Sequence, residues 1–224
     1  MIKVNVFDRV KLDTNIDYIV TNVEDLVEKY RNRRDIAFIS CANSLLFMDG
    51  GSDLGYMNSI DGIEEKVKGA LKNLELVSRC GRNYLPISCA QLIIPEETYK
   101  FVSCPTMFLP QNVGETRNPY YALRAALNVV YEYNKICPDE DRVKEVFTPF
   151  MCAGWGGIDR EKGYQMMMEA CGDYGAGDFD FKIVGNACFS MSKRYEEITQ
   201  EQPKNYMNTE FGISISQVIA NLQK

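Results

Sequence analysis

The chain has 224 residues, 46% of them hydrophobic and 25% charged, which fits one large globular domain or a medium domain with an appendage. Its formal net charge of −6 argues against general nucleic-acid binding, which needs clustered lysine and arginine to neutralise phosphates. The longest basic run, Arg31-Asn32-Arg33-Arg34, is typical of a solvated turn between a helix and a strand.

No apolar stretch approaches the roughly 20 residues of a membrane span, and the alternating start at residues 1–6 lacks the apolar segment of a signal peptide. We therefore expect a cytoplasmic protein in a reducing environment, with no membrane contact. The eight cysteines are spread evenly, so we expect free thiols rather than disulfides. Because the chain has no histidine and no Cys-x-x-Cys pair, we expect no metal site and no cofactor.

Hydrophobic periodicity predicts strands and helices that alternate along the chain. The expected strands are 2–6, 17–20, 36–39, 91–94, 100–104, 143–151 and 181–189. The expected helices are 23–30, one after residue 51, 61–76, 118–133, one from Asp159 to Gly172, and 215–222. This order predicts an α/β fold, a three-layer α/β/α sandwich with a mostly parallel central sheet.

Helix ends and composition indicate where these elements begin and how the chain divides. Asn22, Asn118 and Asp159 are expected N-caps, and Pro119 lies in the first turn after Asn118. The chain becomes rich in Gly and Asp around residues 172–180. We therefore expect one domain over residues 1–175 and a C-terminal extension, residues 176–224, packed on it.

The loop after strand 36–39 has the chemistry of a ligand site. In an open parallel sheet, ligands bind beyond the carboxyl ends of the strands, which is where residues 41–55 lie. The glycines Gly50 and Gly51 let backbone amides approach a phosphate, and Asn43 offers a donor and an acceptor to sugar hydroxyls. Asp49 and Asp53 would repel phosphate and suit hydroxyls, a base edge or a water. The alternative is that Asp-Gly-Gly is only a turn.

Four segments together resemble the macro-domain family. Ala42-Asn43-Ser44, followed by Met48-Asp49-Gly50-Gly51 and Asp53, resembles the family's signature loop, in the branch where Ala-Asn-Ser precedes Phe-Met-Asp-Gly-Gly. The stretches 104–110, 116–127 and 149–157 resemble its later segments in the expected order. The resemblance covers about residues 20–175.

The resemblance implies a three-layer sandwich in which ADP-ribose lies across the strand ends, with its diphosphate between two glycine-rich loops. The residues it assigns to binding are Asp25, Ala42, Asn43, Ser44, Asp49, Gly50, Gly51, Ser52, Asp53, Cys152, Ala153, Gly154, Trp155, Gly156 and Gly157. The second loop departs from the family, because Cys152-Ala153-Gly154 stands where Gly-Thr-Gly is usual. Losing that threonine hydroxyl and the first glycine would weaken phosphate contacts or reshape the distal pocket.

Several of these residues also have a structural interpretation. Asn43 either contacts the distal ribose or makes an Asx turn, and Asp53 either activates a water or caps a helix. Asp25 is either the adenine-side acid or a first-turn residue of a helix capped by Asn22. Trp155 either packs over the distal ribose or lies in the core.

The remaining candidates flank the expected site. Tyr120 and Tyr121 either wall the adenine pocket or pack in the core. Cys41 and Cys152 have no visible base or cation beside them, so we interpret them as packing residues rather than nucleophiles.

The sequence thus predicts binding of ADP-ribose or an ADP-ribosylated substrate. It further predicts hydrolysis of an ADP-ribose 1''-phosphate or ADP-ribosyl bond by a water that Asn43 and Asp53 position. The alternatives are a non-catalytic ADP-ribose reader and a structural protein that keeps the fold. The oligomeric state stays open.

Overall fold

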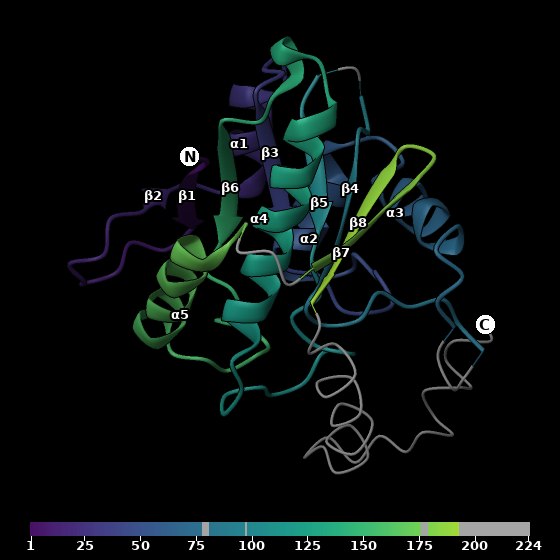
Figure 1. The fold of residues 1–224 in the computed structure, drawn as a ribbon. Coiled ribbons are helices and arrows are strands. Elements are labelled where there is room, and N and C mark those ends of the chain that lie inside the picture. The colour runs from purple at the N-terminus through teal and green to yellow at the C-terminus, as the bar shows by residue number, and fades with distance from the viewer. Residues whose placement is uncertain (78–80, 97, 176–178, 193–224) are drawn as a thin grey trace.

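A computed structural model describes residues 1–77, 81–96, 98–175 and 179–192, and within these residues one eight-stranded sheet lies between two layers of helices (Figure 1). The strand order is β2-β1-β6-β3-β5-β4-β8-β7. The strands are β1 (Lys3–Asp8), β2 (Ile19–Val20), β3 (Ile36–Ser40), β4 (Cys89–Ile93), β5 (Lys100–Ser103), β6 (Glu145–Pro149), β7 (Phe179–Val184) and β8 (Ala187–Ser192). The helices are α1 (Val23–Tyr30), α2 (Gly51–Ser59), α3 (Ile63–Lys72), α4 (Asn118–Ile136) and α5 (Arg160–Asp173), with a short 3₁₀ turn at Asp139–Asp141.

The sheet has a parallel half and an antiparallel half. β1 runs parallel to β2 and β6, and β3 runs parallel to β6 and β5. β4 is antiparallel to β5 and β8, and β7 and β8 form an antiparallel hairpin at the edge. The α/β/α sandwich is confirmed, and its parallel half brings the carboxyl ends of β1, β6, β3 and β5 to the same side of the molecule.

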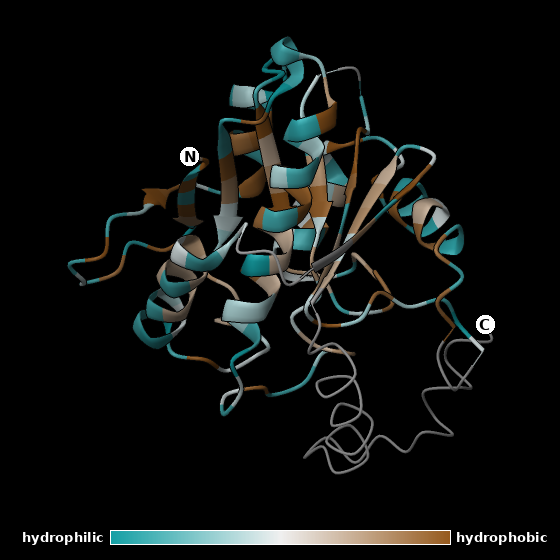
Figure 2. Cartoon of the chain, viewed as in Figure 1, coloured by the Kyte–Doolittle hydropathy of each residue, from teal (hydrophilic) through white to brown (hydrophobic). Residues whose placement is uncertain are grey.

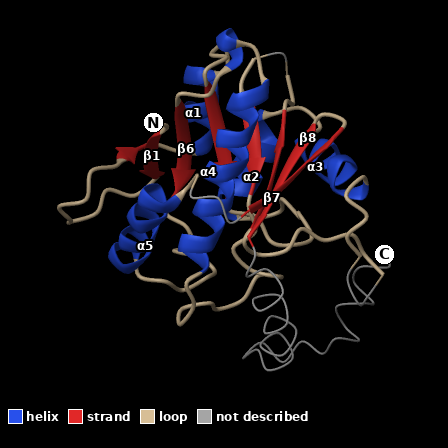
Figure 3. Ribbon diagram, in the orientation of Figure 1, coloured by secondary structure: helices blue, strands red, loops and turns tan. Residues whose placement is uncertain are grey.

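Helices cover both faces of the sheet, with α4 and α5 on one face and α1, α2 and α3 on the other (Figure 3). β3 shows why two layers form, because all five of its residues are buried. Ala37 and Ile39 pack into the core beneath α4, while Ile36 and Phe38 pack into the core beneath α1 to α3. β3 is accordingly coloured in hydrophobic shades over most of its length in Figure 2. A strand that is covered on both faces needs apolar residues at successive positions, which explains the continuous apolar run in the sequence.

Two of the three expected helix caps are present. The Asn22 side chain accepts a hydrogen bond from the Asp25 backbone N at 2.7 Å, and Asp159 accepts from the Glu161 backbone N at 3.0 Å. These bonds satisfy amides that would otherwise lack a partner at the helix start.

The expected Asn118 cap is wrong, because α4 begins one residue earlier than the cap requires. Arg117 occupies the N-cap position, and the Thr116 hydroxyl accepts from the Asn118 backbone N at 3.3 Å. The Asn118 side chain instead donates to the Thr106 carbonyl at 2.7 Å. It therefore links α4 to the segment that follows β5.

The C-terminal part differs from the expectation in two places. The single strand expected over 181–189 is wrong, because Gly185, with a φ of +57°, turns the chain between β7 and β8. Helix α5 continues through Gly172 and ends at Asp173. The helix expected over 215–222 lies outside the described residues.

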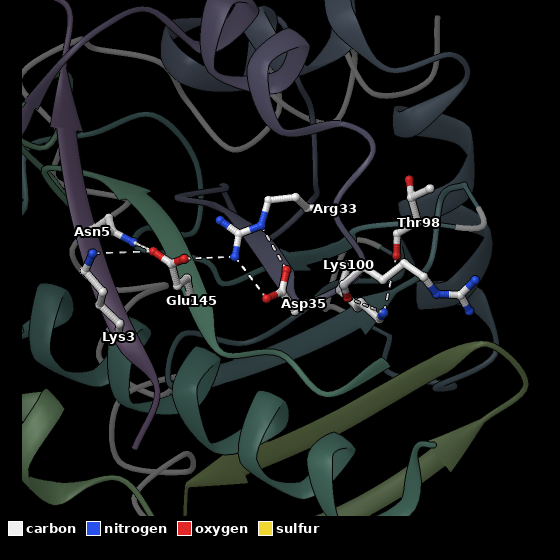
Figure 4. Close-up of polar contacts among 8 residues, drawn as sticks. Lys3, Asn5, Arg33, Asp35, Thr98, Lys100 and Glu145 are labelled. Carbon is white, nitrogen blue, oxygen red and sulfur yellow. Dashed lines mark hydrogen bonds and ion pairs between the residues drawn. The ribbon is translucent and has the colours of Figure 1, made fainter. Parts of the chain in front are cut away.

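A network of charges joins the amino ends of the strands, on the side away from the strand ends just described (Figure 4). Arg33 donates to Asp35 and to Glu145, each at 2.9 Å, and Asn5 donates to Glu145 at 3.1 Å. Hydrogen bonding to Arg33 is the main cause that lowers the pKa of Asp35. Burial raises the pKa of Glu145, but Arg33, Asn5 and Lys3 together lower it below its ordinary value. The network connects the turn after α1 with β1 and β6.

Glycine at position 55 is needed for α1 and α2 to approach each other. A Cβ on Gly55 would lie 2.7 Å from the Val23 Cβ, an atom attached directly to the backbone of α1. We expect Gly55→Ala to lower the free energy of unfolding by about 1–3 kcal/mol through overpacking. Gly69 is an exposed glycine in α3, and a Cβ added there would meet no atom within 4 Å. Gly69→Ala should therefore raise the free energy of unfolding by about 0.5–1 kcal/mol. Urea unfolding of both variants checks this, and equal effects would contradict the packing argument.

Candidate functional site

A cavity of about 690 Å³ lies at the carboxyl ends of the parallel strands. This volume is within the range of roughly 300–1,000 Å³ that small-molecule sites occupy. Its walls come from the end of β1, the start of α1, the loop between β3 and α2, the segment after β5, and the loop between β6 and α5. It therefore lies where open parallel sheets bind ligands.

The start of α2 presents backbone amides to this cavity. The N-cap residue Gly50 provides no side-chain cap, so the first amides of the helix, from Gly51 to Asp53, have no capping side chain. Gly51 has a φ of +58°, which favours glycine, and a side chain at either glycine would meet no atom within 4 Å. Uncapped amides at a helix N-terminus form a site for an anion such as phosphate.

Asn43 lines the cavity, but most of its hydrogen-bonding capacity holds its own loop. Its Oδ1 accepts from the backbone N atoms of Leu45 at 3.1 Å and Phe47 at 3.4 Å, and its Nδ2 donates to the Phe47 carbonyl at 2.8 Å. The Asx-turn interpretation is therefore correct, and these bonds use only one of the two hydrogens on Nδ2.

Asp53 is a buried carboxylate in the wall of the cavity. Asp53 is 6% exposed, and its Oδ1 accepts a hydrogen bond from the Ser40 hydroxyl at 2.7 Å. Burial raises the pKa of Asp53 to about 7, the Ser40 hydrogen bond opposes this shift, and the nearby Asp49 charge adds to it. Asp53 lies in the first turn of α2 and not at its cap, which is Gly50. A carboxylate with a pKa near neutrality can take up a proton from a water.

Three thiols lie near this carboxylate. Cys41 and Cys152 line the cavity, and Cys104 donates to the Ser40 carbonyl at 3.4 Å beneath it. Burial raises the pKa of all three thiols, that of Cys152 to about 12. The three thiols are therefore protonated at neutral pH, which agrees with the interpretation of Cys41 and Cys152 as packing residues. All seven described cysteines are free, and no three thiol or carboxylate groups in the described residues converge as a metal site requires.

The second glycine-rich loop, residues 152–157, is tightly folded and also lines the cavity. Cys152 has a φ of +62°, a left-handed conformation that favours glycine. A Cβ on Gly156 would lie 2.6 Å from the Cys152 carbonyl, so only glycine fits there. The Gly156 carbonyl accepts from the Val113 backbone N at 2.8 Å, which fixes the loop to the segment after β5.

Trp155 lines the cavity between the glycines of this loop and is 65% exposed. The alternative that placed Trp155 in the core is therefore wrong. The core interpretation of Tyr120 and Tyr121 is correct instead, since both pack into the cluster beneath α4 and neither lines the cavity.

Most of the predicted binding residues come together at the cavity, and four do not. Asn43, Asp49, Gly50, Gly51, Ser52, Asp53, Cys152, Ala153, Gly154, Trp155 and Gly156 line it, whereas Asp25, Ala42, Ser44 and Gly157 do not. Asp25 bonds to its helix cap, and Ala42 is buried in the core beneath α1 to α3. The Ser44 backbone N donates to the Met107 carbonyl at 2.9 Å, and Gly157 lies against Asn112.

The structure adds a wall that sequence reasoning missed. Asp8 and Arg9 at the end of β1, Asn22 and Glu24 at the start of α1, and Arg160 at the start of α5 line the cavity at one end. Arg160 donates to Asp8 at 2.7 Å. The strand-end rule was the available signal, because Asp8 ends a parallel strand just as Ser40 does. Asn22 was recognised only as a helix cap.

The arrangement of elements matches a known fold. No protein-family model matches the sequence, and no curated protein matches it. The macrodomain of Mycobacterium tuberculosis DarG superposes with a TM-score of 0.50 at 15% sequence identity, covering 77% of this chain and 92% of that one. The fold is that of a macro domain. None of the helices in the described part of the chain is long and apolar enough to cross a membrane.

Proposed function

We propose that this macro-domain fold binds ADP-ribose, or an ADP-ribosyl substrate, in the cavity at the strand ends. The observation that carries this proposal is the position of the two glycine-rich loops, both of which line that cavity. The uncapped amides from Gly51 to Asp53 would hold the diphosphate. The wall formed by Asn22 and Glu24 would face the adenine, and the remaining amide hydrogen of Asn43 would face the distal ribose.

We further propose that Asp53 acts as the general base in hydrolysis at C1'' of the distal ribose. A water would attack C1'', the bond from C1'' to the leaving group would break, and the Asp53 carboxylate would take the proton of the water. Burial beside Ser40 with a pKa of about 7 supports this role. Because Asn43 uses most of its amide within its own loop, it would orient the loop and donate one bond to the substrate.

A non-catalytic reader is the alternative, and one feature favours it. Where the family has a threonine hydroxyl in the second loop, this chain has Ala153. The alanine offers no donor to a phosphate or a water, so turnover would rest on Asp53 alone.

Calorimetry with ADP-ribose tests binding. We expect measurable heat with ligand at about 1 mM or below, which corresponds to at least about 4 kcal/mol of binding free energy. Absence of heat at that concentration would contradict the binding proposal.

Turnover is tested with ADP-ribose 1''-phosphate and with ADP-ribosylated protein as separate substrates. Asp53→Asn should retain binding and lose about 10²–10⁴-fold in rate. The exposed Asp61, in the turn between α2 and α3, provides the matched control Asp61→Asn, which should keep the wild-type rate. Binding without turnover of either substrate would favour the reader.

A further inference from the structure

The two ends of the cavity carry different chemistry. The β1 end consists of Asp8, Arg9, Asn22, Glu24 and Arg160. The β5 end consists of Phe47, Met107, Pro110 and Trp155.

Backbone pairing brings the residues of the β5 end together. Asn43, four residues before Phe47 in the first loop, forms a β-bridge with Met107. Met107 packs with Cys152 of the second loop, and Gly156 of that loop bonds to Val113. Trp155 therefore stands on a loop fixed to the segment after β5.

Charge is distributed unequally between these ends. Among the described residues that line the cavity, the cationic side chains are Arg9 and Arg160, and both lie at the β1 end. Away from the β1 end the charged lining residues are Asp49 and Asp53, both acidic, in the loop that follows β3 and in the first turn of α2. Lys68 lies 4.4 Å from the centre of the Phe47 ring, but it pairs with Glu64 and does not line the cavity.

This distribution disfavours a phosphate at the β5 end. A phosphate ester on C1'' would bring further negative charge toward Asp49 and Asp53, and the cations among the described lining residues lie at the other end of the cavity. A flat cationic ring would instead meet the face of an exposed tryptophan and the nearby carboxylates. Tryptophan is the best partner among aromatic side chains for such a cation, and offset stacking adds to the contact.

We propose that the β5 end takes the nicotinamide ring of an NAD⁺-type dinucleotide, with Trp155 stacking on the ring. The inference rests on the proposed binding of ADP-ribose, because the same dinucleotide core would occupy the rest of the cavity. It selects, among ligands that share this core, those whose distal ribose carries a planar ring rather than a phosphate.

Trp155 is the only tryptophan in the chain, so its fluorescence reports directly on this contact. The probes are carba-NAD, whose carbocyclic ring prevents release of nicotinamide, together with ADP-ribose and ADP-ribose 1''-phosphate. We expect carba-NAD to quench the fluorescence on binding and ADP-ribose to leave it nearly unchanged. By calorimetry, the 1''-phosphate should bind about tenfold or more weakly than carba-NAD.

Substitution of Trp155 separates stacking from general binding. Trp155→Ala should weaken carba-NAD about tenfold and change the affinity for ADP-ribose by less than about threefold. Trp155→Phe, which keeps an aromatic face, should recover most of the affinity. Because the side chain is largely exposed, both variants should unfold at the wild-type temperature.

Two results would overturn the inference while leaving the proposed function intact. One is binding of the 1''-phosphate as tightly as carba-NAD, and the other is an equal loss of carba-NAD and ADP-ribose affinity in Trp155→Ala. If ADP-ribose itself does not bind the wild type, the proposed function fails instead.

Discussion

Asp53→Asn is expected to raise the free energy of unfolding above the wild-type value by about 4 kcal/mol more at pH 8 than below pH 4. Burial raises the pKa of Asp53 from 3.8 to about 7 in the folded state. Each pKa unit corresponds to about 1.4 kcal/mol, so a shift of about three units gives this magnitude. Asparagine keeps the oxygen that accepts from Ser40 and carries no charge that burial can penalise.

The sign follows from proton binding in the two states. Below about pH 4 both folded and unfolded Asp53 are protonated, and the raised pKa has no effect. Between about pH 4 and 7 only the folded state keeps the proton, so the stability of the wild type falls as pH rises. Above about pH 7 Asp53 is ionised in both the folded and the unfolded state, so the wild type has lost the full amount of stability.

Urea unfolding at intervals from pH 4 to pH 8 measures this difference. Asp61→Asn removes an exposed carboxylate near the other end of α2 and should keep the wild-type pH profile. If Asp53→Asn also kept that profile, the Asp53 carboxylate would have to be solvated or paired in the folded protein. A variant that gains stability and loses turnover would place Asp53 among residues retained for activity at the expense of stability.

Asp141→Ala is expected to lower the free energy of unfolding by about 3–5 kcal/mol, because it leaves a buried ammonium without its carboxylate. Lys100 is 1% exposed, and its Nζ lies 3.2 Å from Asp141. The same Nζ donates to the carbonyls of Arg34 at 2.8 Å and Thr98 at 3.3 Å, which do not neutralise its charge. Figure 4 shows Lys100 beside Thr98 at the amino end of β5.

Removing the lysine should be far less harmful than removing its partner. Lys100→Met replaces the buried charge by an apolar chain of similar length, and Asp141 still pairs with Arg34 at 2.9 Å. We expect the free energy of unfolding of Lys100→Met to lie within about 2 kcal/mol of the wild-type value. The double variant, Lys100→Met with Asp141→Ala, should lose less stability than Asp141→Ala alone.

Asp139 provides the matched control for these variants. It pairs with Arg142 at 3.0 Å, but its side chain is 86% exposed. Asp139→Ala should therefore cost less than about 1 kcal/mol. Chemical denaturation of the four variants gives the comparison, and an equal cost for Asp139→Ala and Asp141→Ala would contradict the role of burial.

The layers of the fold were readable in the sequence because local patterns specify them. The apolar run at Ile36–Ile39 predicts a strand buried on both faces, and the helical spacing of Val23, Leu26 and Val27 predicts α1. The loop with Asn43 and Asp53 was readable for the same reason, since its residues are contiguous. Its position after a parallel strand predicts a ligand site.

The end of the cavity formed by Asp8, Asn22 and Arg160 depended on tertiary structure. These residues are far apart in the chain, and only the pairing of β1 with β2 and β6 brings their elements together. Long-range pairing leaves no local pattern, so the sequence pointed to Asp25 where the folded chain presents Asn22 and Glu24. The conformations of Asn43 and Trp155 also depended on tertiary structure. An amide in such a loop can bind its own backbone or a ligand, and a lone tryptophan can be buried or exposed, until neighbouring segments fix the outcome.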